Sequence, residues 1–321
     1  IGVLFCSVLG GMKSVTWTQV AQYIILIISY LVPVVYLSYQ LFSIPIPELM
    51  YGRLLQSNNT KSIEITRDAK EKESRALWKK DADEANAKIK MGNLTDAEID
   101  KLKAAAKTAT QQAISPAASD DATVGRYLTV PTGVGMWNFL ALTFCLMVGT
   151  AGLPHILTRY YTTPSVRQAR VSVAWSLFFI FLLYFTAPAY AAFARYAIYV
   201  KLVGTKIAEL PRWITLWQPA GLFDVVDKNG DGIVQWADFV VKSTDFVVLS
   251  MPEVAGLPFV ITGLVMAGGL AAALSTADGL LLTIANAISH DLYYNVINPQ
   301  ATLTKRLTVT KVLLVVTALI A

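Results

Sequence analysis

The stretch GGLAAALSTADGLLL, residues 268–282, places a pair of hydroxyls and a carboxylate within a run of small and apolar residues. On a helix, Ala272, Ser275 and Asp278 repeat every three residues and so lie near one stripe. The hydroxyls of Ser275 and Thr276 alone are a weak functional signal, because such hydroxyls usually bond the backbone of their own helix. A carboxylate beside them is a stronger signal, provided that the helix lies in a membrane.

Composition places this helix in a membrane. Of the 321 residues, 55% are hydrophobic and only 15% are charged, whereas soluble domains are about 25% charged. A spanning helix needs about 20 mostly apolar residues, and four stretches reach this length: 15–42, 134–158, 170–200 and 253–289. Two more apolar runs, 1–9 and one beginning near 309, reach the chain ends, so we expect an internal fragment of a longer protein.

Within a bilayer, a charge near the centre of a helix costs about 3 kcal/mol or more unless it faces a partner or water. Asp278 is therefore a candidate functional residue. The two cysteines, Cys6 and Cys145, lie in apolar runs and indicate neither a disulfide framework nor a thiolate metal site.

Basic residues indicate the orientation of the spans. Three short linkers, each separated from the next by two spans, carry Lys13, then Arg159, Arg167 and Arg170, then Lys305 and Arg306. The positive-inside rule makes all three linkers cytoplasmic. The long polar segments 44–132 and 201–250 are then extracytoplasmic. The net charge of +5 is explained by this topology, and we expect the lipid bilayer, not a nucleic acid, as the partner.

The segment 44–132 has the composition of a helical insertion. Thr95 and Glu98 form a capping box at the start of its second helix, and Gly92 and Asn93 supply the preceding turn. We therefore predict a helical hairpin. Its charged surface is either a solvated face or an arm that binds a protein partner.

The segment 201–250 contains DKNGDGIVQWAD, residues 227–238, which resembles an EF-hand loop. The candidate calcium ligands at positions 1, 3, 5, 7 and 12 are Asp227, Asn229, Asp231, Ile233 and Asp238. Gly232 is placed at the sharp turn. Asp at position 12 is shorter than the usual Glu, so weak calcium binding is predicted. The alternative is an Asx-rich turn that binds no metal.

The stretch VGTAGLPHILTRYY, residues 148–161, interrupts a span. Gly149, Gly152 and Pro154 weaken helical hydrogen bonding, and broken helices are typical of transporters. The alternative is a simple helix end at Pro154. His155 is placed either to contact a substrate or carry a proton, or to mark the membrane boundary beside Arg159.

Four motifs together resemble the sodium:solute symporter family, most closely its acetate and short-chain monocarboxylate permease branch: GGLAAALSTADG, SHDLYY, GGMKSVTWTQVAQ and GTAGLPHILTRYYTTPSVRQAR. The similarity covers the membrane segments but not the insertion at 44–132.

This resemblance implies an all-α polytopic fold in which ten core helices form two inverted five-helix repeats. It divides the chain as follows: the end of core helix 4 and core helix 5 in 1–43, the helical insertion in 44–132, core helices 6 and 7 in 133–200, the loop with the EF-hand-like motif in 201–250, core helix 8 in 251–291, and a cytoplasmic loop with a truncated core helix 9 in 292–321.

The resemblance also implies a sodium site. The sodium ligands that the resemblance places on this chain are the Ala272 carbonyl and the Ser275 and Thr276 hydroxyls. Asp278 would add negative charge or accept a proton. The core helix 1 ligands would precede residue 1. Gln19 is a departure, because several relatives carry an Asp there that is thought to help sodium leave. The substrate-side candidates are Gly149, Thr150, Gly152 and His155.

The implied function is sodium-coupled uptake of a small, acetate-like organic anion by alternating access, across the cytoplasmic membrane of a bacterium. Sodium is the transported ion, and calcium is a further candidate. Two alternatives stay open: a proton as the coupling ion with Asp278 as its carrier, or a transporter-like sensor domain of a signalling protein. Because no nucleophile-and-base arrangement or phosphate loop is visible, we expect no enzyme activity.

Overall fold

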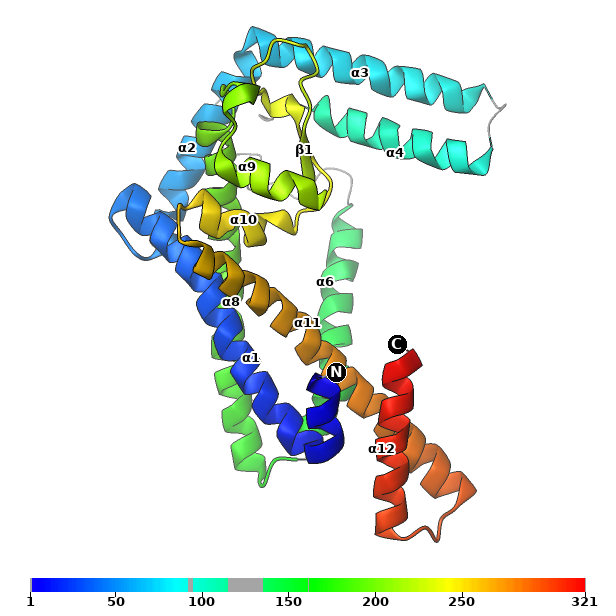
Figure 1. Cartoon of the computed structure of the whole chain (residues 1–321). Helices are drawn as coiled ribbons and strands as arrows, with labels where there is room; N and C mark the ends of the chain where they lie inside the picture. Colours follow the sequence, from blue (N-terminus) through cyan, green and yellow to red (C-terminus); the bar gives the residue numbers. More distant parts are fainter. Residues whose placement is uncertain (1, 92–94, 115–134, 161, 321) are drawn as a thin grey trace. The chain divides into compact units, whose positions relative to one another are not determined.

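The computed structural model describes residues 2–91, 95–114, 135–160 and 162–320 (Figure 1). The chain forms two compact units. The first unit comprises residues 1–31, 130–183 and 263–321, and the second comprises 32–129 and 184–262. Three long helices contribute residues to both units: α1 (Gly2–Phe42), α8 (Val166–Lys201) and α11 (Phe259–Ala287).

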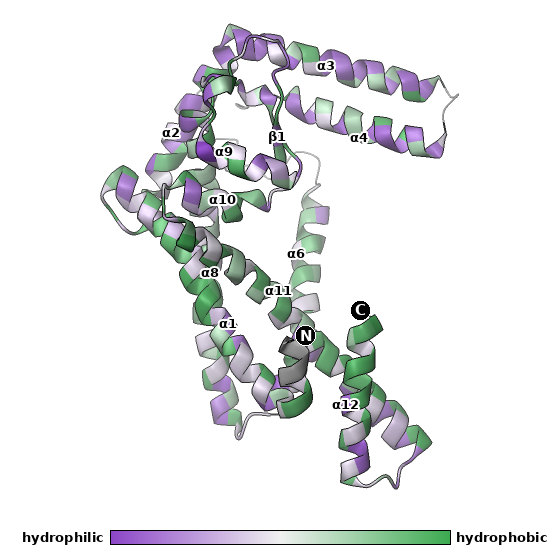
Figure 2. Ribbon diagram, in the orientation of Figure 1, coloured by the Kyte–Doolittle hydropathy of each residue, from purple (hydrophilic) through white to green (hydrophobic). Residues whose placement is uncertain are grey.

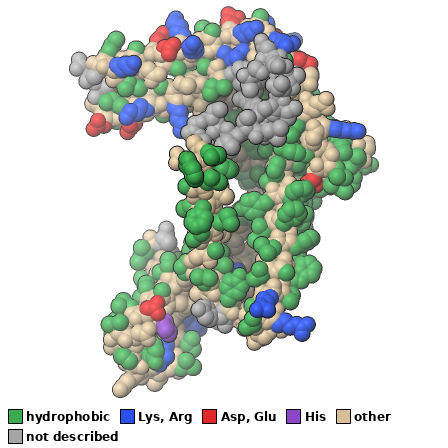
Figure 3. Space-filling model, turned by 180° about the vertical axis from the view of Figure 1, so that it is seen from behind, with side chains coloured by type: hydrophobic (Ala, Val, Ile, Leu, Met, Phe, Trp, Pro, Cys, Tyr) green, Lys and Arg blue, Asp and Glu red, His purple; other side chains and the backbone are tan. Residues whose placement is uncertain are grey.

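Within the described residues, three helical segments are long and apolar enough to cross a membrane: Ser7–Phe42, Val166–Lys201 and Phe259–Ile297. Helices α6 (Met136–Ala151) and α7 (Pro154–Tyr160) are bent by 44° at their junction and give a fourth span if the pair crosses together. Figure 2 shows that these helices consist largely of hydrophobic residues, and Figure 3 shows hydrophobic side chains on the surface of the molecule. Such surfaces require lipid or further protein around them. The predicted fold class, a helical polytopic membrane protein, is confirmed.

A glycine divides α1 into two helices. Gly11 has φ 56° and ψ −150°, a left-handed conformation that residues with a side chain rarely adopt. The segment 2–10 is thereby separated from residues 12–42, which agrees with the predicted boundary between the first apolar run and the span at 15–42. Lys13 lies exposed just after the turn.

The helix that carries the opening motif is displaced relative to its predicted limits of 251–291. Helix α10 (Phe246–Val254) ends before Gly256, whose φ is 76°, and α11 begins only at Phe259. At its other end α11 continues as a π-helix over Ile288–Ile297. The SHDLYY motif therefore lies within the helix rather than at its end. Helix α12 (Leu303–Ile320) follows, and its Thr310 hydroxyl donates to the Ser289 hydroxyl at 2.6 Å.

In the second unit, the predicted helical hairpin is present. After α2 (Pro47–Arg67), Asp68 caps α3 (Ala69–Lys90) by accepting from two backbone amides. Helix α4 (Asp96–Gln112) packs along α3 (Figure 1) and starts with the predicted capping box, in which Glu98 accepts from the Thr95 amide at 2.9 Å. The predicted turn residues Gly92 and Asn93 lie outside the described residues. Lys and Arg side chains gather on the hairpin surface (Figure 3).

The predicted loop at 201–250 contains short elements of its own. A short antiparallel pair of strands, β1 (Phe223–Val225) and β2 (Phe239–Val241), flanks the EF-hand-like loop. Around it lie the 3-10 turns η1 (Ile207–Glu209), η2 (Gln218–Ala220) and η3 (Trp236–Asp238) and helix α9 (Arg212–Trp217). Four aromatic rings pack around these strands, with the rings of Phe223 and Phe246 5.0 Å apart; the others are Trp213 and Phe239. This aromatic core holds the loop in place.

Candidate functional site

The predicted ligand oxygens on α11 lie together around one carbonyl. The hydroxyls of Ser275 and Thr276 donate to the Ala272 carbonyl at 2.8 and 3.3 Å. The Ser275 carbonyl accepts a hydrogen bond from the Gln19 amide of α1 at 2.7 Å. Each hydroxyl thus uses its proton within the helix and retains lone pairs for another partner. That this partner is a sodium ion stays a prediction.

Gln19 joins α1 to this part of α11. Its side chain is only 9% exposed, and its Oε1 atom is buried with no hydrogen-bond partner among the described residues. The same two helices approach closely at Gly268, where a Cβ atom would clash with the Ser29 Oγ. A side chain at position 268 would therefore have to displace the Ser29 hydroxyl.

Asp278 is the buried carboxylate that the sequence singled out, and it is 2% exposed. The Ser7 hydroxyl, from the segment before Gly11, donates to its Oδ1 atom in a short hydrogen bond. Its Oδ2 atom is buried and has no partner within the described part of the chain. The site thus holds a carboxylate that is only half satisfied by hydrogen bonds.

Helix α7 brings two basic side chains against α11. A Cβ atom at Gly279 would lie 3.5 Å from Arg159 Nη2 and 3.7 Å from the His155 ring, so the guanidinium and the imidazole lie beside this glycine. The basic linkers had indicated only the topology of Arg159, not this contact. Arg159 lies four residues after His155, and this spacing puts both side chains on one face of a helix, which is the sequence feature that could have predicted their shared contact with α11.

The four substrate-side candidates are separated by the bend between α6 and α7. The Thr150 hydroxyl donates to the Leu146 carbonyl at 2.5 Å, and Gly152 ends α6. Gly149, Thr150 and Gly152 are exposed, and of the four only His155 is brought to α11. The bend of 44° is that of a broken span or a re-entrant loop.

The EF-hand-like loop is closed by its own hydrogen bonds. Asp227 accepts from the Gly230 and Gly232 amides at 2.8 and 2.9 Å. Asp231 accepts from the Ile233 amide at 2.8 Å. Although partial burial raises it, the pKa of Asp231 is lowered to about 2 by Lys70, the Ile233 amide and Gln235. The Lys70 ammonium lies 3.0 Å from the Asp231 Oδ2.

The position-12 carboxylate, Asp238, faces the protein and is 0% exposed. It accepts hydrogen bonds from the Ser74 hydroxyl at 2.6 Å and from the backbone amide of Gln235 at 3.0 Å. Among the described residues, no group of three His, Cys, Asp or Glu side chains is arranged to hold a metal. The loop therefore does not support the calcium prediction. Its hydrogen bonds, including that from the Asp231 backbone amide to the Asn229 side chain at 3.3 Å, form an Asx-rich turn, and whether this turn binds calcium stays a prediction.

A second buried carboxylate, which the sequence analysis missed, lies beside this loop. Glu71 of α3 is 1% exposed and accepts from the Ala237 amide at 3.2 Å. Burial raises its pKa to about 7, although the Ala237 amide and Arg75 oppose this. Nothing in the sequence around Glu71 indicates its burial, because α3 is a charged helix whose contact with the loop is made only in the folded unit.

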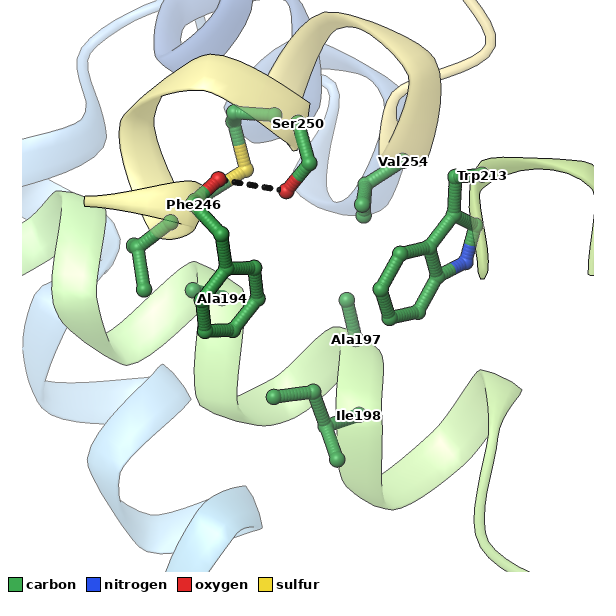
Figure 4. A pocket seen from close by; sticks show the side chains of 9 residues that line it. Ala194, Ala197, Ile198, Trp213, Phe246, Ser250 and Val254 are labelled. Carbon is green, nitrogen blue, oxygen red and sulfur yellow. Dashed lines mark hydrogen bonds between the residues drawn. The ribbon is translucent and has the colours of Figure 1, made fainter. Parts of the chain in front are cut away.

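One small cavity lies in the second unit between α8, α9 and α10 (Figure 4). Its volume is about 10 Å³, roughly the space for one water molecule. The lining is apolar and includes Ala197, Trp213, Phe246 and Val254. The Ser250 hydroxyl is already bonded to the Phe246 carbonyl at 2.7 Å. This cavity is too small and too apolar to be a site for a polar substrate.

Long apolar helices, a broken span and a buried carboxylate held between helices define a polytopic membrane protein with a polar site among its helices. Residues 232–321 match the family model described as the sodium:solute symporter family. The predicted resemblance to that family is therefore confirmed.

Two similar proteins are named as a symporter and a transporter. An uncharacterized symporter of Cupriavidus necator is 41% identical over 360 aligned residues, which cover 100% of this chain and 53% of that protein. A monocarboxylic acid transporter of Corynebacterium glutamicum is 29% identical over 189 residues, covering 57% of this chain and 27% of that protein. The chain thus spans about half the length, or less, of these relatives. No solved structure matches the chain.

Proposed function

We propose that the protein is a secondary active transporter that couples sodium entry to the uptake of a small monocarboxylate. The observation that carries this proposal is the polar cluster of α11, in which a buried Asp278 lies one turn from two hydroxyls on a shared carbonyl. Polar groups inside an apolar span are rare and mark ion or substrate pathways. The cluster lies within the residues that match the sodium:solute symporter family.

Sodium would be held by oxygen atoms from Ala272, Ser275 and Thr276. The hydroxyl oxygens keep lone pairs for a cation because their protons point to the Ala272 carbonyl. Asp278 adds a negative charge one turn further along. The unpartnered Gln19 Oε1 atom, close to the Ser275 carbonyl, offers another neutral oxygen. A partly broken helix elsewhere in the protein supplies the remaining carbonyl ligands in transporters of this kind.

The substrate side is assigned to the bend between α6 and α7, with Gly149, Thr150, Gly152 and His155. Backbone groups freed at a break inside a membrane must find protein, ion or substrate partners. The printed name of the Corynebacterium relative supports a monocarboxylic acid as the substrate class. Acetate is the smallest suitable probe.

The orientation follows from the basic linkers. Residues 44–132 and 201–250 are placed outside the cytoplasmic membrane of a bacterium, and the linkers with Lys13, Arg167 and Lys305 inside. The α3–α4 hairpin is then a charged arm in the external solvent. Sodium would favour the outward-facing state that accepts substrate, and its gradient would drive the return to the inward-facing state.

The experiment is uptake of radiolabelled acetate into membrane vesicles that contain the full-length protein, with and without a sodium gradient. Ser275→Ala combined with Thr276→Ala removes both candidate hydroxyls. Thr283→Ala is the matched control, because its hydroxyl bonds the Gly279 carbonyl of the same helix at 2.8 Å but lies two turns away. We expect sodium-dependent uptake that collapses in the double variant and survives in the control. Equal uptake without sodium would reject sodium coupling.

Proton coupling is the second candidate, and the Oδ2 atom of Asp278 favours it. A buried carboxylate oxygen with no partner is stabilised by protonation as well as by a bound cation. If a proton is the coupling ion, Asp278→Asn abolishes uptake driven by a pH gradient, whereas removal of sodium and loss of the two hydroxyls leave uptake intact.

A further inference from the structure

Arg159 has unused hydrogen-bonding capacity inside the first unit. Its guanidinium is half-buried and lies against Gly279 of α11. Among the described residues it makes no hydrogen bond, and no carboxylate lies within 4.0 Å of it. A guanidinium carries five donors in a planar fork that matches a carboxylate in a bidentate pair. An anion is therefore the partner that this group can accept.

Asp278 has the opposite charge and also has an oxygen atom without a hydrogen-bond partner among the described residues. Its Oδ1 is engaged by Ser7, while its Oδ2 is buried with no partner among the described residues. The charges of Asp278 and Arg159 are near enough to attract each other, although they do not form a direct ion pair. The two residues come from different helices, α11 and α7, and α7 lies just beyond the bend of the broken span.

We propose that Arg159 and Asp278 each bind one of the two transported ions. Arg159 binds the carboxylate of the substrate, and Asp278 binds the coupling cation. This inference rests on the proposed function and adds a substrate-binding residue to it. In the empty protein the two charges partly neutralise each other. In the loaded protein each has its own counter-ion, so the site again contains no uncompensated charge.

The arrangement explains why the two ions travel together. When the anion binds Arg159 alone, Asp278 loses the attraction of that cationic group and gains affinity for a cation. When the cation binds Asp278 alone, Arg159 gains affinity for an anion in the same way. By thermodynamic linkage the two increases in affinity are equal.

The test uses the full-length protein in proteoliposomes, with acetate as the anion and sodium as the cation. Acetate affinity is measured at low and high sodium, and sodium affinity at low and high acetate. The variants are Arg159→Gln, Asp278→Asn and their combination. Arg167→Gln is the matched control, because Arg167 is an exposed guanidinium near the start of α8.

We expect Arg159→Gln to weaken acetate binding by about tenfold or more while sodium still binds in the absence of acetate. Asp278→Asn should weaken sodium binding with acetate binding at zero sodium retained, and the combined variant should lose the mutual enhancement of the two affinities. Coupling factors in transporters and other linked systems are about 5- to 150-fold, so its loss is measurable. The control should behave as the wild type.

An acetate affinity of Arg159→Gln within twofold of the wild type would overturn the inference, with the proposed function intact. A wild-type protein that takes up no short monocarboxylate under any ion gradient would overturn the proposed function first. If Arg159→Gln does not reach the membrane, Arg159→Lys is used to test the inference instead. It keeps the charge but loses the bidentate fork, so weaker acetate binding with unchanged sodium binding supports the inference and unchanged acetate binding refutes it.

Discussion

The buried Glu71 makes the stability of the second unit depend on pH in an unusual direction. Its carboxyl group is 1% exposed and its pKa is raised to about 7, chiefly by burial. In the unfolded chain the same group has an ordinary pKa of 4.5. The folded state therefore binds a proton more tightly than the unfolded state does.

The sign and size of the effect follow from this difference. Below pH 4.5 the carboxyl is protonated in both states and the stability is at its full value. Between pH 4.5 and about 7 the folded state binds more protons, so stability falls as pH rises. A change in pKa from 4.5 to about 7 corresponds to about 3 kcal/mol, at about 1.4 kcal/mol for each tenfold change in proton affinity. That loss is complete above pH 7.

Glu71→Gln is the perturbation that tests this reasoning, because the amide keeps an acceptor for the Ala237 amide and cannot ionise. We expect the variant to melt at a higher temperature than the wild type at pH 8 and at the same temperature at pH 4.5. With about 2–4 °C per kcal/mol for a unit of this size, the difference at pH 8 is about 6–12 °C.

The assay is thermal unfolding of the purified full-length protein in detergent, followed by tryptophan fluorescence at several pH values. Glu64→Gln is the matched control, since the Glu64 side chain of α2 is 56% exposed, and we expect it to leave the pH profile unchanged. A variant that melts below the wild type at pH 8 would refute the argument. It would mean that ionised Glu71, through Arg75 and the Ala237 amide, stabilises the fold.

Three further predictions concern packing and metal binding. Gly268→Ala should reduce the amount of folded protein in the membrane, since its Cβ would clash with the Ser29 Oγ. Adding Ser29→Ala to this variant should restore the yield. Equal yields of the wild type, the single variant and the double variant would contradict this. Ser74→Ala removes a donor to the buried Asp238 and should lower the free energy of unfolding by about 1–3 kcal/mol. Denaturant titration measures this change, and a change below about 0.5 kcal/mol would count against the role of Ser74 as a stabilising donor. Millimolar calcium should leave the melting temperature unchanged, because the acidic oxygens of the loop already accept internal hydrogen bonds; a rise with calcium that is reversed by a chelator would restore the EF-hand prediction.

Several features of this protein were predictable from the sequence because they depend on neighbouring residues. The length of an apolar run limits where a span can lie, and the structure places long helices at three of the four predicted stretches and a bent pair at the other. The capping box of Thr95 and Glu98 joins residues three positions apart. The weak helical propensity of Gly149, Gly152 and Pro154 indicated the bend between α6 and α7.

Other features depend on contacts between residues distant in the chain, and only the tertiary structure decided them. Asp278 is bonded to Ser7, 271 positions away, and Ser275 to Gln19, 256 positions away. No local pattern links these pairs. The function of Asp278 is therefore indicated by the cost of burying a charge, while its partners are fixed by helix packing.

The EF-hand-like loop shows the difference most clearly. The spacing of Asp227, Asp231 and Asp238 determined a tight turn rich in acidic oxygens, as the local hydrogen bonds confirm. Only the folded unit shows that α3 brings Lys70 to Asp231 and Ser74 to Asp238. The physical reason is that spacing sets which atoms can converge, whereas packing sets which donors reach them first.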